Sequence, residues 1–238
     1  MTVSSAFRGT AVAAAGIALV LSGCSSSSPP RPAGGGGVST SPATPTPQRA
    51  LQATDYVLPA SAAPPGFTAS PATGSGGGTD PAGATALNAC VGAHFFRIVA
   101  NQADSADFAN DASGTFFASG AQVIPAVDVA EDAMALADPT IVGRLPGCLQ
   151  KISNEDPTGS TGGLGANIDS VVKINIPGTL YAVRMKTSTD GTTTYLDVAF
   201  FARGRIEESL TVGQTSAPPD GALDAELATQ INQLLANQ

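Results

Sequence analysis

The sequence predicts an α+β fold in which helices cover an antiparallel β-sheet, in a sandwich-like arrangement, behind a disordered N-terminal tether. Three observations indicate this fold. Residues 171–212 are rich in Val, Thr, Tyr and Phe and contain short turn signals, helical patterns precede and follow them, and residues 25–49 are low in complexity. Helices and strands that are segregated along the chain, rather than alternating, are typical of an α+β fold.

The first 23 residues have the composition of a secretory signal peptide. Arg8 precedes a run of small and apolar residues over 11–21, and Ser22 and Gly23 follow the run. At ~1.5 Å per residue this run would cover only about 17 Å as a helix, well short of the ~30 Å hydrocarbon core of a bilayer. We therefore expect a cleaved signal peptide over 1–23 and not a permanent transmembrane helix.

The segment Leu21-Ser22-Gly23-Cys24 resembles the lipobox of bacterial lipoproteins. The resemblance implies that the Cys24 thiol carries diacylglycerol, that the chain is cut before this residue, and that the new amine carries an acyl chain such as palmitate. Two or more acyl chains give lasting membrane attachment. The alternative is a plain secretory signal with a chance cysteine. With a lipobox, the protein is expected on the extracytoplasmic face of the cell membrane.

Residues 24–49 are expected to form a lipid-linked, disordered linker, and residues 50–79 an extended arm with a flexible break. The linker is dominated by Ser, Pro and Gly, so it cannot bury enough apolar surface to offset the entropy lost on ordering. Pro64-Pro65 prevents a helix in the arm. The expected anchors of the arm are Tyr56, Leu58 and Phe67, and its flexible break is Gly74 to Gly78.

The globular domain is expected over 80–238. Its first helix should begin near Thr79-Asp80-Pro81, because proline is tolerated in the first turn of a helix. Apolar residues at helical spacing extend this helix to 101 and turn Cys90 inward. His94, in the same helix, is expected to be a core or boundary side chain and not a catalytic base. The elements that follow are one or two short strands around 108 and over 115–129, a helix over 129–136, and a second short helix from Asp138-Pro139 to Lys151. Gly114, Gly120 and Pro125 interrupt the strand region, so a bulge or bend is expected there.

Four strands are expected over 171–176, 179–187, 192–201 and 205–212, after a polar loop over 154–167. Asp190-Gly191 and Arg203-Gly204 are tight-turn sequences, so the strands should form an antiparallel meander of hairpins. Alternation places Tyr181, Val183 and Met185 on one face. After Pro218-Pro219, Asp220 would cap a final helix with a stripe formed by Leu223, Leu227, Ile231 and Leu234.

The chain has 3 cysteines, and the lipobox accounts for Cys24. We expect Cys90 and Cys148 to form a disulfide, because disulfides persist outside the cell. The chain-entropy model gives such a bridge ~4 kcal/mol of stabilisation. The alternative is a redox or metal site. Two cysteines far apart in sequence, with His94 the only histidine, lack the usual ligand spacing, so no metal is expected.

The charge balance is acidic, with 11 Lys and Arg against 19 Asp and Glu, a net charge of −8. The signal peptide contains Arg8 and no acid, so the mature balance is 10 against 19, or −9. An acidic chain without a basic cluster gains nothing from neutralising phosphates, which argues against nucleic acid as a partner. Anionic lipid headgroups would repel the chain too, which leaves the acyl chains as the membrane contact.

No catalytic motif is found in the sequence. It has a single histidine, no Gly-x-Ser-x-Gly, and no Lys-Ser/Thr after the glycine run that would indicate a phosphate loop. The adjacent acids Glu131-Asp132 and Glu207-Glu208 are expected to lie on solvated faces. Neighbours on a strand point to opposite faces, so Glu207 and Glu208 cannot flank one substrate together. We therefore expect no enzymatic activity and no cofactor.

Several short motifs together resemble a family of secreted lipoproteins. They are the lipobox, Pro64-Pro65-Gly66-Phe67, Ala86-Leu87-Asn88-Ala89-Cys90, Phe116-x-Ala118-Ser119-Gly120, Pro146-Gly147-Cys148-Leu149 and Ala202-Arg203-Gly204-Arg205. The chain resembles actinobacterial, mycobacterial-type lipoproteins with a PsbP-like or kinase-sensor-like α/β domain. The resemblance implies a non-catalytic binding or sensor module for a small cell-envelope ligand or a partner protein. The alternative is a lipid carrier with an apolar cavity for acyl chains.

Overall fold

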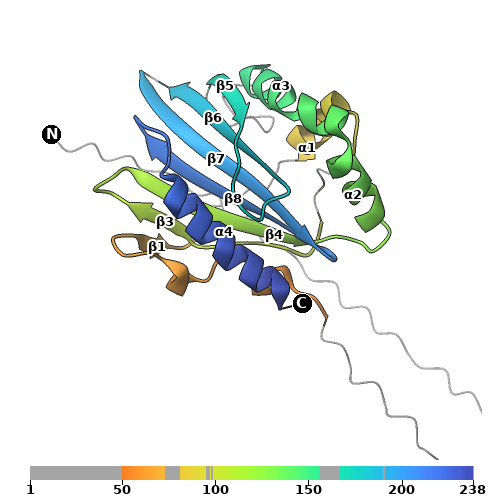
Figure 1. The fold of residues 1–238 in the computed structure, drawn as a ribbon, viewed down its shortest axis with the longest axis horizontal. Coiled ribbons are helices and arrows are strands. Elements are labelled where there is room, and N and C mark those ends of the chain that lie inside the picture. Colours follow the sequence, from red (N-terminus) through yellow and green to blue (C-terminus); the bar gives the residue numbers. More distant parts are fainter. Residues whose placement is uncertain are drawn as a thin grey trace, which may run out of the picture. The chain divides into compact units, whose positions relative to one another are not determined.

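The computed structural model describes residues 50–72, 81–94, 97, 99–155, 167–189 and 191–237. They belong to one compact unit, Gln48–Gln238. In these residues an eight-stranded antiparallel sheet has helices packed on both faces, which confirms the predicted α+β class (Figure 1). The strand order is β1-β3-β4-β8-β7-β6-β5, and β2 pairs with β4 beside this path.

The predicted meander forms half of the sheet. Its strands are β5 (Asn167–Lys173), β6 (Tyr181–Thr189), β7 (Thr192–Arg203) and β8 (Ile206–Thr215). Each pairs antiparallel with the next, and Gly204 makes the β7–β8 turn with φ 55°. The meander is therefore confirmed, although β5 begins and ends earlier than expected and β7 and β8 are longer.

The other half of the sheet comes from the N-terminal part of the domain. It contains β1 (Thr68–Ser70), β2 (Gln102–Asp104), β3 (Asp107–Asn110) and β4 (Thr115–Val123). The two strands expected around 108 and over 115–129 are confirmed as β3 and β4, but the expected bulge or bend in the second strand was wrong. β4 is a continuous strand that pairs with β8 from Thr115 and Gln214 to Val123 and Ile206, so Gly120 does not interrupt it.

The arm packs on the domain and adds β1 to the edge of the sheet. It is not extended throughout as predicted, because it contains two short 3-10 helices, η1 (Ala53–Asp55) and η2 (Ala60–Ala62). The expected anchors Tyr56 and Leu58 are buried, and the Phe67 ring lies 5.1 Å from that of Phe117, centroid to centroid. The Leu58 N–H donates to Ser119 Oγ at 2.9 Å, which fixes the arm to β4.

Helix α4 (Gly221–Ala236) crosses one face of the sheet (Figure 1). Asp220 caps it as predicted, since its side chain accepts a hydrogen bond from the Ala222 N–H at 3.0 Å. The stripe of fully buried side chains is shifted slightly from the predicted one. It consists of Leu227, Ala228, Ile231 and Leu235, with Leu223 and Leu234 partly buried.

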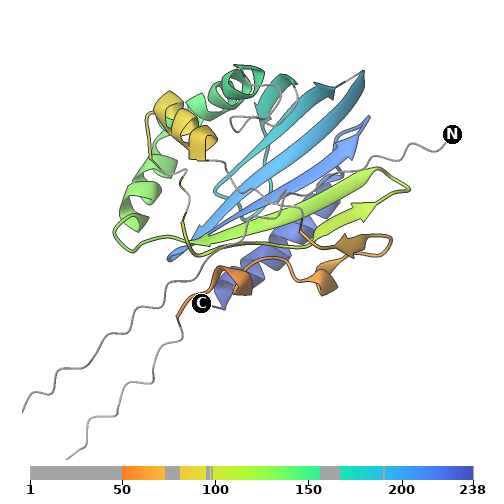
Figure 2. The same ribbon diagram turned by 180° about the vertical axis from the view of Figure 1, so that it is seen from behind.

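Helices α1 (Pro81–Val91), α2 (Val129–Ala137) and α3 (Pro139–Glu155) belong to the opposite face, which is turned to the viewer in Figure 2. The prediction that the first helix extends to 101 was wrong. Val91 is the last residue of the helix, because Gly92, the next residue, has the left-handed conformation with φ +79° that is typical of a helix end. The helix pair after β4 is confirmed, and α3 continues beyond Lys151.

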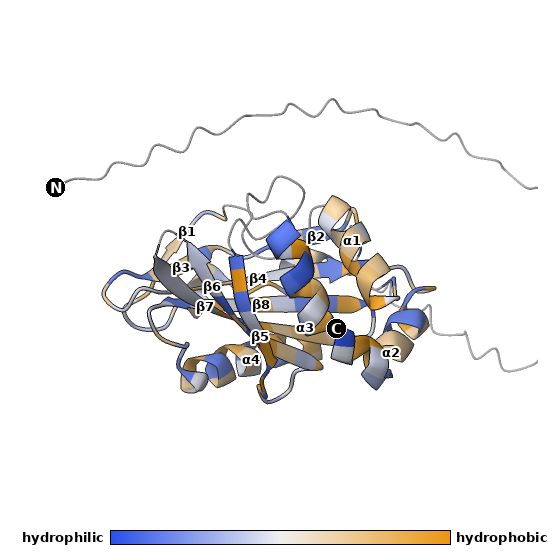
Figure 3. Cartoon of the chain, turned by 90° about the horizontal axis from the view of Figure 1, so that it is seen from above, coloured by the Kyte–Doolittle hydropathy of each residue, from blue (hydrophilic) through white to orange (hydrophobic). Residues whose placement is uncertain are grey.

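Strand alternation divides the apolar side chains into two cores. Ala182 contributes to the core under α4, whereas Tyr181 and Val183 contribute to the core under α1 and α3, as the predicted alternation requires. Seen from above and coloured by hydropathy, α4 and α1 lie on opposite sides of the strands (Figure 3). The sheet is therefore covered on both faces.

The predicted signal peptide, Cys24, the linker and the glycine break at Gly74 to Gly78 lie outside the described residues. So do Asp190 and most of the predicted polar loop over 154–167. Among the helices that the structure describes, none has the length and apolar character needed to span a bilayer.

Candidate functional site

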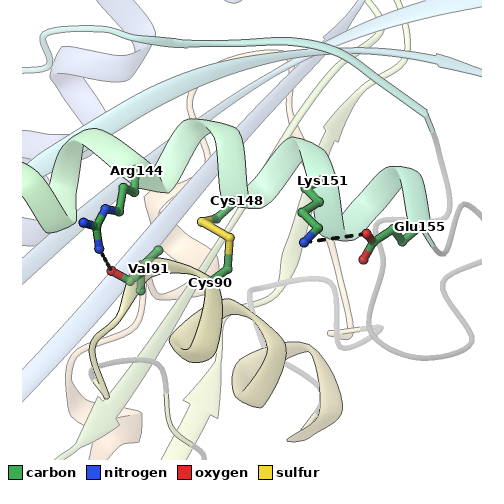
Figure 4. The surroundings of a disulfide bond; sticks show 6 residues. All are labelled: Cys90, Val91, Arg144, Cys148, Lys151 and Glu155. Carbon is green, nitrogen blue, oxygen red and sulfur yellow. Dashed lines mark hydrogen bonds and ion pairs between the residues drawn. A yellow bond between two sulfur atoms is a disulfide. The ribbon is translucent and has the colours of Figure 1, made fainter.

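The two cysteines of the domain form a disulfide, as predicted. Cys90 in the last turn of α1 is bonded to Cys148 in the middle of α3, with a Cα–Cα distance of 5.7 Å (Figure 4). Arg144 Nη1 donates to the carbonyl of Val91 at 3.4 Å, so a cation also meets the C-terminal end of α1. The bridge therefore clamps α1 to α3 on one face of the sheet.

His94 is exposed and lies after α1, not inside it. The prediction of a core or boundary imidazole was wrong, because it assumed a helix that continues past Gly92. The His94 carbonyl accepts a hydrogen bond from Arg97 Nε at 3.1 Å. Because His94 is exposed, its imidazole is not part of the core.

The prediction that both acid pairs are solvated was wrong for three of the four residues. Glu131 is exposed, but Asp132 and Glu208 are 3% and 2% exposed, and Glu207 is only half-buried. The two glutamates do point to opposite faces of the sheet: Glu207 faces α2, and Glu208 faces the core under α4. Asp132 of the first pair and Glu207 of the second pair therefore contact each other.

We call Arg97, Gln122, Asp128, Asp132 and Glu207 the α2 cluster. Gln122 Nε2 on β4 donates to Glu207 Oε2 on β8 at 2.6 Å, and the Glu207 carboxyl hydrogen bonds to that of Asp132 on α2. Arg97 donates to both oxygens of Asp132, at 2.8 and 2.7 Å, and lies 3.1 Å from Asp128 Oδ2. The cluster thus joins two strands, α2 and the segment after α1.

The environment of the α2 cluster favours a bound proton. Burial, with a smaller contribution from the neighbouring Asp132 carboxyl, raises the pKa of Glu207 to about 7. Burial also raises the pKa of Asp132, and Arg97 opposes this change by favouring the carboxylate. Two carboxyl groups in contact can hydrogen bond only when one of them is protonated, so the pair shares a proton near neutral pH.

We call Arg184, Asp197 and Asp224 the α4 cluster. Arg184 on β6 forms a bidentate ion pair with Asp197 on β7, with Nε–Oδ1 at 2.6 Å and Nη2–Oδ2 at 2.5 Å. Asp224, in the first turn of α4, hydrogen bonds to Asp197, and burial followed by this contact raises the pKa of Asp224 to about 7. The construction of the α2 cluster is thus repeated on the opposite face of the sheet.

Glu208 lies in the core under α4, close to the Ser119 hydroxyl. Its strand neighbours in register are Ala121 and Phe201, and neither of its carboxyl oxygens has a hydrogen-bond partner among the described residues. Burial raises the pKa of Glu208 to about 9, although the nearby Ser119 hydroxyl lowers it slightly. The Glu208 side chain is therefore a neutral carboxylic acid at pH 7.

A shallow depression of about 220 Å³ lies between the arm and α4. Its walls are formed by Leu58, Pro59, Gln230, Gln233, Leu234 and Asn237. This volume is below the roughly 300–1,000 Å³ of typical small-molecule pockets. The depression is lined by amide and aliphatic side chains and contains no titratable residue, so it can offer hydrogen bonds and apolar contact but no acid–base chemistry.

Sequence patterns alone do not predict these clusters, and Arg97, Arg184, Asp197 and Asp224 carry no motif. One signal is present: Asp197 interrupts an apolar stretch of a strand, and its register partner is Arg184. Within the described ranges, no three His, Cys, Asp or Glu side chains gather in a way that could hold a metal ion. The clusters instead combine acids with a cation from the chain itself.

The chain matches no protein-family model and no curated protein. The resemblance to actinobacterial lipoproteins is therefore carried by the quoted motifs alone.

Proposed function

We propose that the protein is a lipid-anchored, extracytoplasmic lipoprotein that acts as a non-catalytic binding or sensor module of the cell envelope. One observation carries the proposal: Cys90 is bonded to Cys148, which leaves Cys24 as the remaining thiol of the chain. A structural disulfide is typical of proteins outside the cytoplasm. The remaining cysteine stands in the segment that resembles a lipobox, where a lipid would be attached.

The order of segments supports anchoring. The compact unit begins at Gln48, just before the end of the low-complexity linker that follows Cys24. The arm follows the linker in the chain and is attached to the sheet through Leu58 and β1. The linker is therefore connected to the sheet through the arm. This arrangement suits a domain held at a distance from the membrane by a tether.

The acidic clusters support a role other than catalysis. In each cluster an arginine is committed to a carboxylate, and the acids link a helix to the sheet. The carboxyl oxygens of Asp132 and Asp197 accept hydrogen bonds from the two arginines, and one oxygen of Glu207 accepts from Gln122. The clusters therefore act as supports of the fold.

Membrane fractionation of Cys24→Ala tests the anchoring. The unsubstituted chain should partition into the membrane fraction and into the detergent phase of a Triton X-114 separation, whereas Cys24→Ala should move to the aqueous phase. The Cys90→Ala/Cys148→Ala variant is the matched control, because it removes the other two cysteines and leaves Cys24 in place. Equal membrane retention of Cys24→Ala and the unsubstituted chain would contradict the proposal.

Native mass spectrometry and organic extraction of the purified chain test the mode of action. A binding or sensor module should yield no stoichiometric lipid beyond its covalent anchor. Recovery of one non-covalent acyl lipid per chain would instead favour the alternative of a lipid carrier. Turnover of esters, peptides or glycans in a broad screen would contradict the non-catalytic assignment.

A further inference from the structure

We propose that the α2 cluster and the α4 cluster are proton-dependent latches, which hold helices against the two faces of the sheet and loosen when the surroundings become alkaline. The inference deepens the proposed sensor role by naming protons as the stimulus, and that part rests on the proposed function. The latches themselves follow from the geometry of the domain.

In the α2 cluster, the hydrogen-bonding groups require a proton. One oxygen of Glu207 accepts from Gln122, and both oxygens of Asp132 accept from Arg97. The remaining contact, between the two carboxyl groups, has no donor unless one of them is protonated. Loss of the proton turns this hydrogen bond into a repulsion between two anions at close range.

The α4 cluster has the same deficit. Both oxygens of Asp197 accept from Arg184. Asp224 Oδ1 is buried and has no donor among the residues that the structure describes, while the Asp224 carboxyl contacts that of Asp197. A buried acceptor without a donor is costly, and a shared proton removes the deficit.

Around each latch the carboxyl groups outnumber the cations. The α2 cluster contains a single cation, Arg97, against Asp128, Asp132 and Glu207. The α4 cluster also contains a single cation, Arg184, and its further neighbours, Asp220 and Tyr195, supply no positive charge. One proton per latch reduces the excess, and the raised pKa values of Glu207 and Asp224 are consistent with this requirement.

Each latch controls a helix docked on the sheet. Asp132 lies in the first turn of α2, and α2 leads through Asp138 into α3, which carries Cys148. Asp224 lies in the first turn of α4, the last helix of the chain. Deprotonation should therefore loosen the N-terminal turn of each helix, on opposite faces of one sheet.

Hydrogen–deuterium exchange of the full mature chain, purified in mild detergent, tests the latches between pH 5 and pH 8. After correction for the intrinsic pH dependence of exchange, the opening equilibrium of the α2 and α4 amides should rise by about tenfold per pH unit and level off near pH 7. Glu207→Gln and Asp224→Asn replace the shared proton with an amide N–H donor. Glu207→Gln should remove the pH dependence in α2, and Asp224→Asn should remove it in α4.

Two exposed acids provide matched controls, Glu131→Gln on α2 and Glu226→Gln on α4. Both should retain the pH dependence of the unsubstituted chain. The same pH dependence in Glu207→Gln as in the unsubstituted chain would overturn the α2 latch, and the corresponding result in Asp224→Asn would overturn the α4 latch.

If a variant does not fold, the latches can be tested on the unsubstituted chain by following the ¹³C chemical shifts of its side-chain carboxyl groups as the pH is changed. Titration of two carboxyl groups near pH 7 supports the latches, and titration of all but Glu208 below pH 5 overturns them. These measurements do not depend on membrane attachment. The latches can therefore be refuted while Cys24 proves to be lipidated, and the anchor can be refuted while the latches hold.

Discussion

The Glu207 carboxyl on β8 hydrogen bonds to the Asp132 carboxyl on α2. Neither adjacent acid pair in the sequence therefore functions as a pair. Instead, the fold separates Glu207 from Glu208 by placing them on opposite faces, and it joins one member of each pair across a helix–sheet interface. Since both partners are acids, this contact makes the stability of the domain depend on pH.

The first prediction is that the domain loses stability as the pH rises. In the folded state, Glu207 and Asp224 have a pKa of about 7 and Glu208 a pKa of about 9, whereas the ordinary values of these groups are 4.5 or lower. Between those limits the folded state binds more protons than the unfolded state. The free energy of unfolding should therefore fall by up to about 1.4 kcal/mol per pH unit for each such group.

Urea denaturation followed by circular dichroism at pH 5, 6, 7, 8 and 9 measures this dependence. We expect the highest stability near pH 5 and a continuing decline to pH 9, since the contribution of Glu208 is lost last. A stability maximum at pH 8 or above would contradict the raised pKa values.

The second prediction concerns the isolated carboxyl of Glu208. Folding at pH 7 requires Glu208 to take up a proton and to bury both oxygens without a partner, so Glu208→Met should raise the free energy of unfolding by about 2 kcal/mol. Glu226→Met, on the exposed side of α4, should change the stability by less than about 0.5 kcal/mol. A loss of stability in Glu208→Met at pH 7 would show that this carboxyl has a stabilising partner.

The third prediction concerns the disulfide. The residues that it joins are separated by 58 positions, so the Cys90→Ala/Cys148→Ala variant should lose about 4 kcal/mol of stability in the chain-entropy model. Urea denaturation measures the loss, and thiol titration of the denatured, non-reduced chain should detect no thiol from Cys90 and Cys148. Two titratable thiols in the secreted chain would refute the bridge. Cys24→Ala serves as the control and should leave the folding free energy unchanged.

The fourth prediction concerns the contact between Phe116 and Gly213. A Cβ at Gly213 would lie 2.0 Å from Phe116 Cζ, so Gly213→Ala must displace the ring and should cost about 1–2 kcal/mol. Gly143→Ala provides the control, because this helical glycine has open space around it and should gain about 0.5–1 kcal/mol. In a Phe116→Ala background the cost of Gly213→Ala should vanish. An equal cost in both backgrounds would mean that the ring is not the obstacle.

The part of the fold encoded by local signals could be predicted from the sequence. The meander follows from β-rich segments joined by tight turns, and the last helix follows from Asp220 and its apolar stripe. The N-terminal strands could not be predicted in the same way. β1, β2 and β3 are short, and the long pairing of β4 with β8 joins segments far apart in the chain. Apolar periodicity also could not show that Gly92 would end the first helix.

In the candidate site, too, one feature could be predicted from the sequence and another depends on long-range contacts. The disulfide was predictable because only one pair of cysteines remained after Cys24. The α2 cluster was not, because each of its contacts depends on tertiary structure that brings Gln122, Asp132 and Glu207 together. Strand alternation alone could separate Glu207 from Glu208, but it could not show which helix would cover either of them.

Mass spectrometry of the mature N-terminal peptide decides whether the protein is lipid-anchored. We expect the mature chain to begin at Cys24 and this residue to carry a diacylglycerol thioether and an N-acyl chain. A mature chain with an unmodified Cys24, or one that begins at another residue, would contradict the claim that this protein is held at the membrane by lipid.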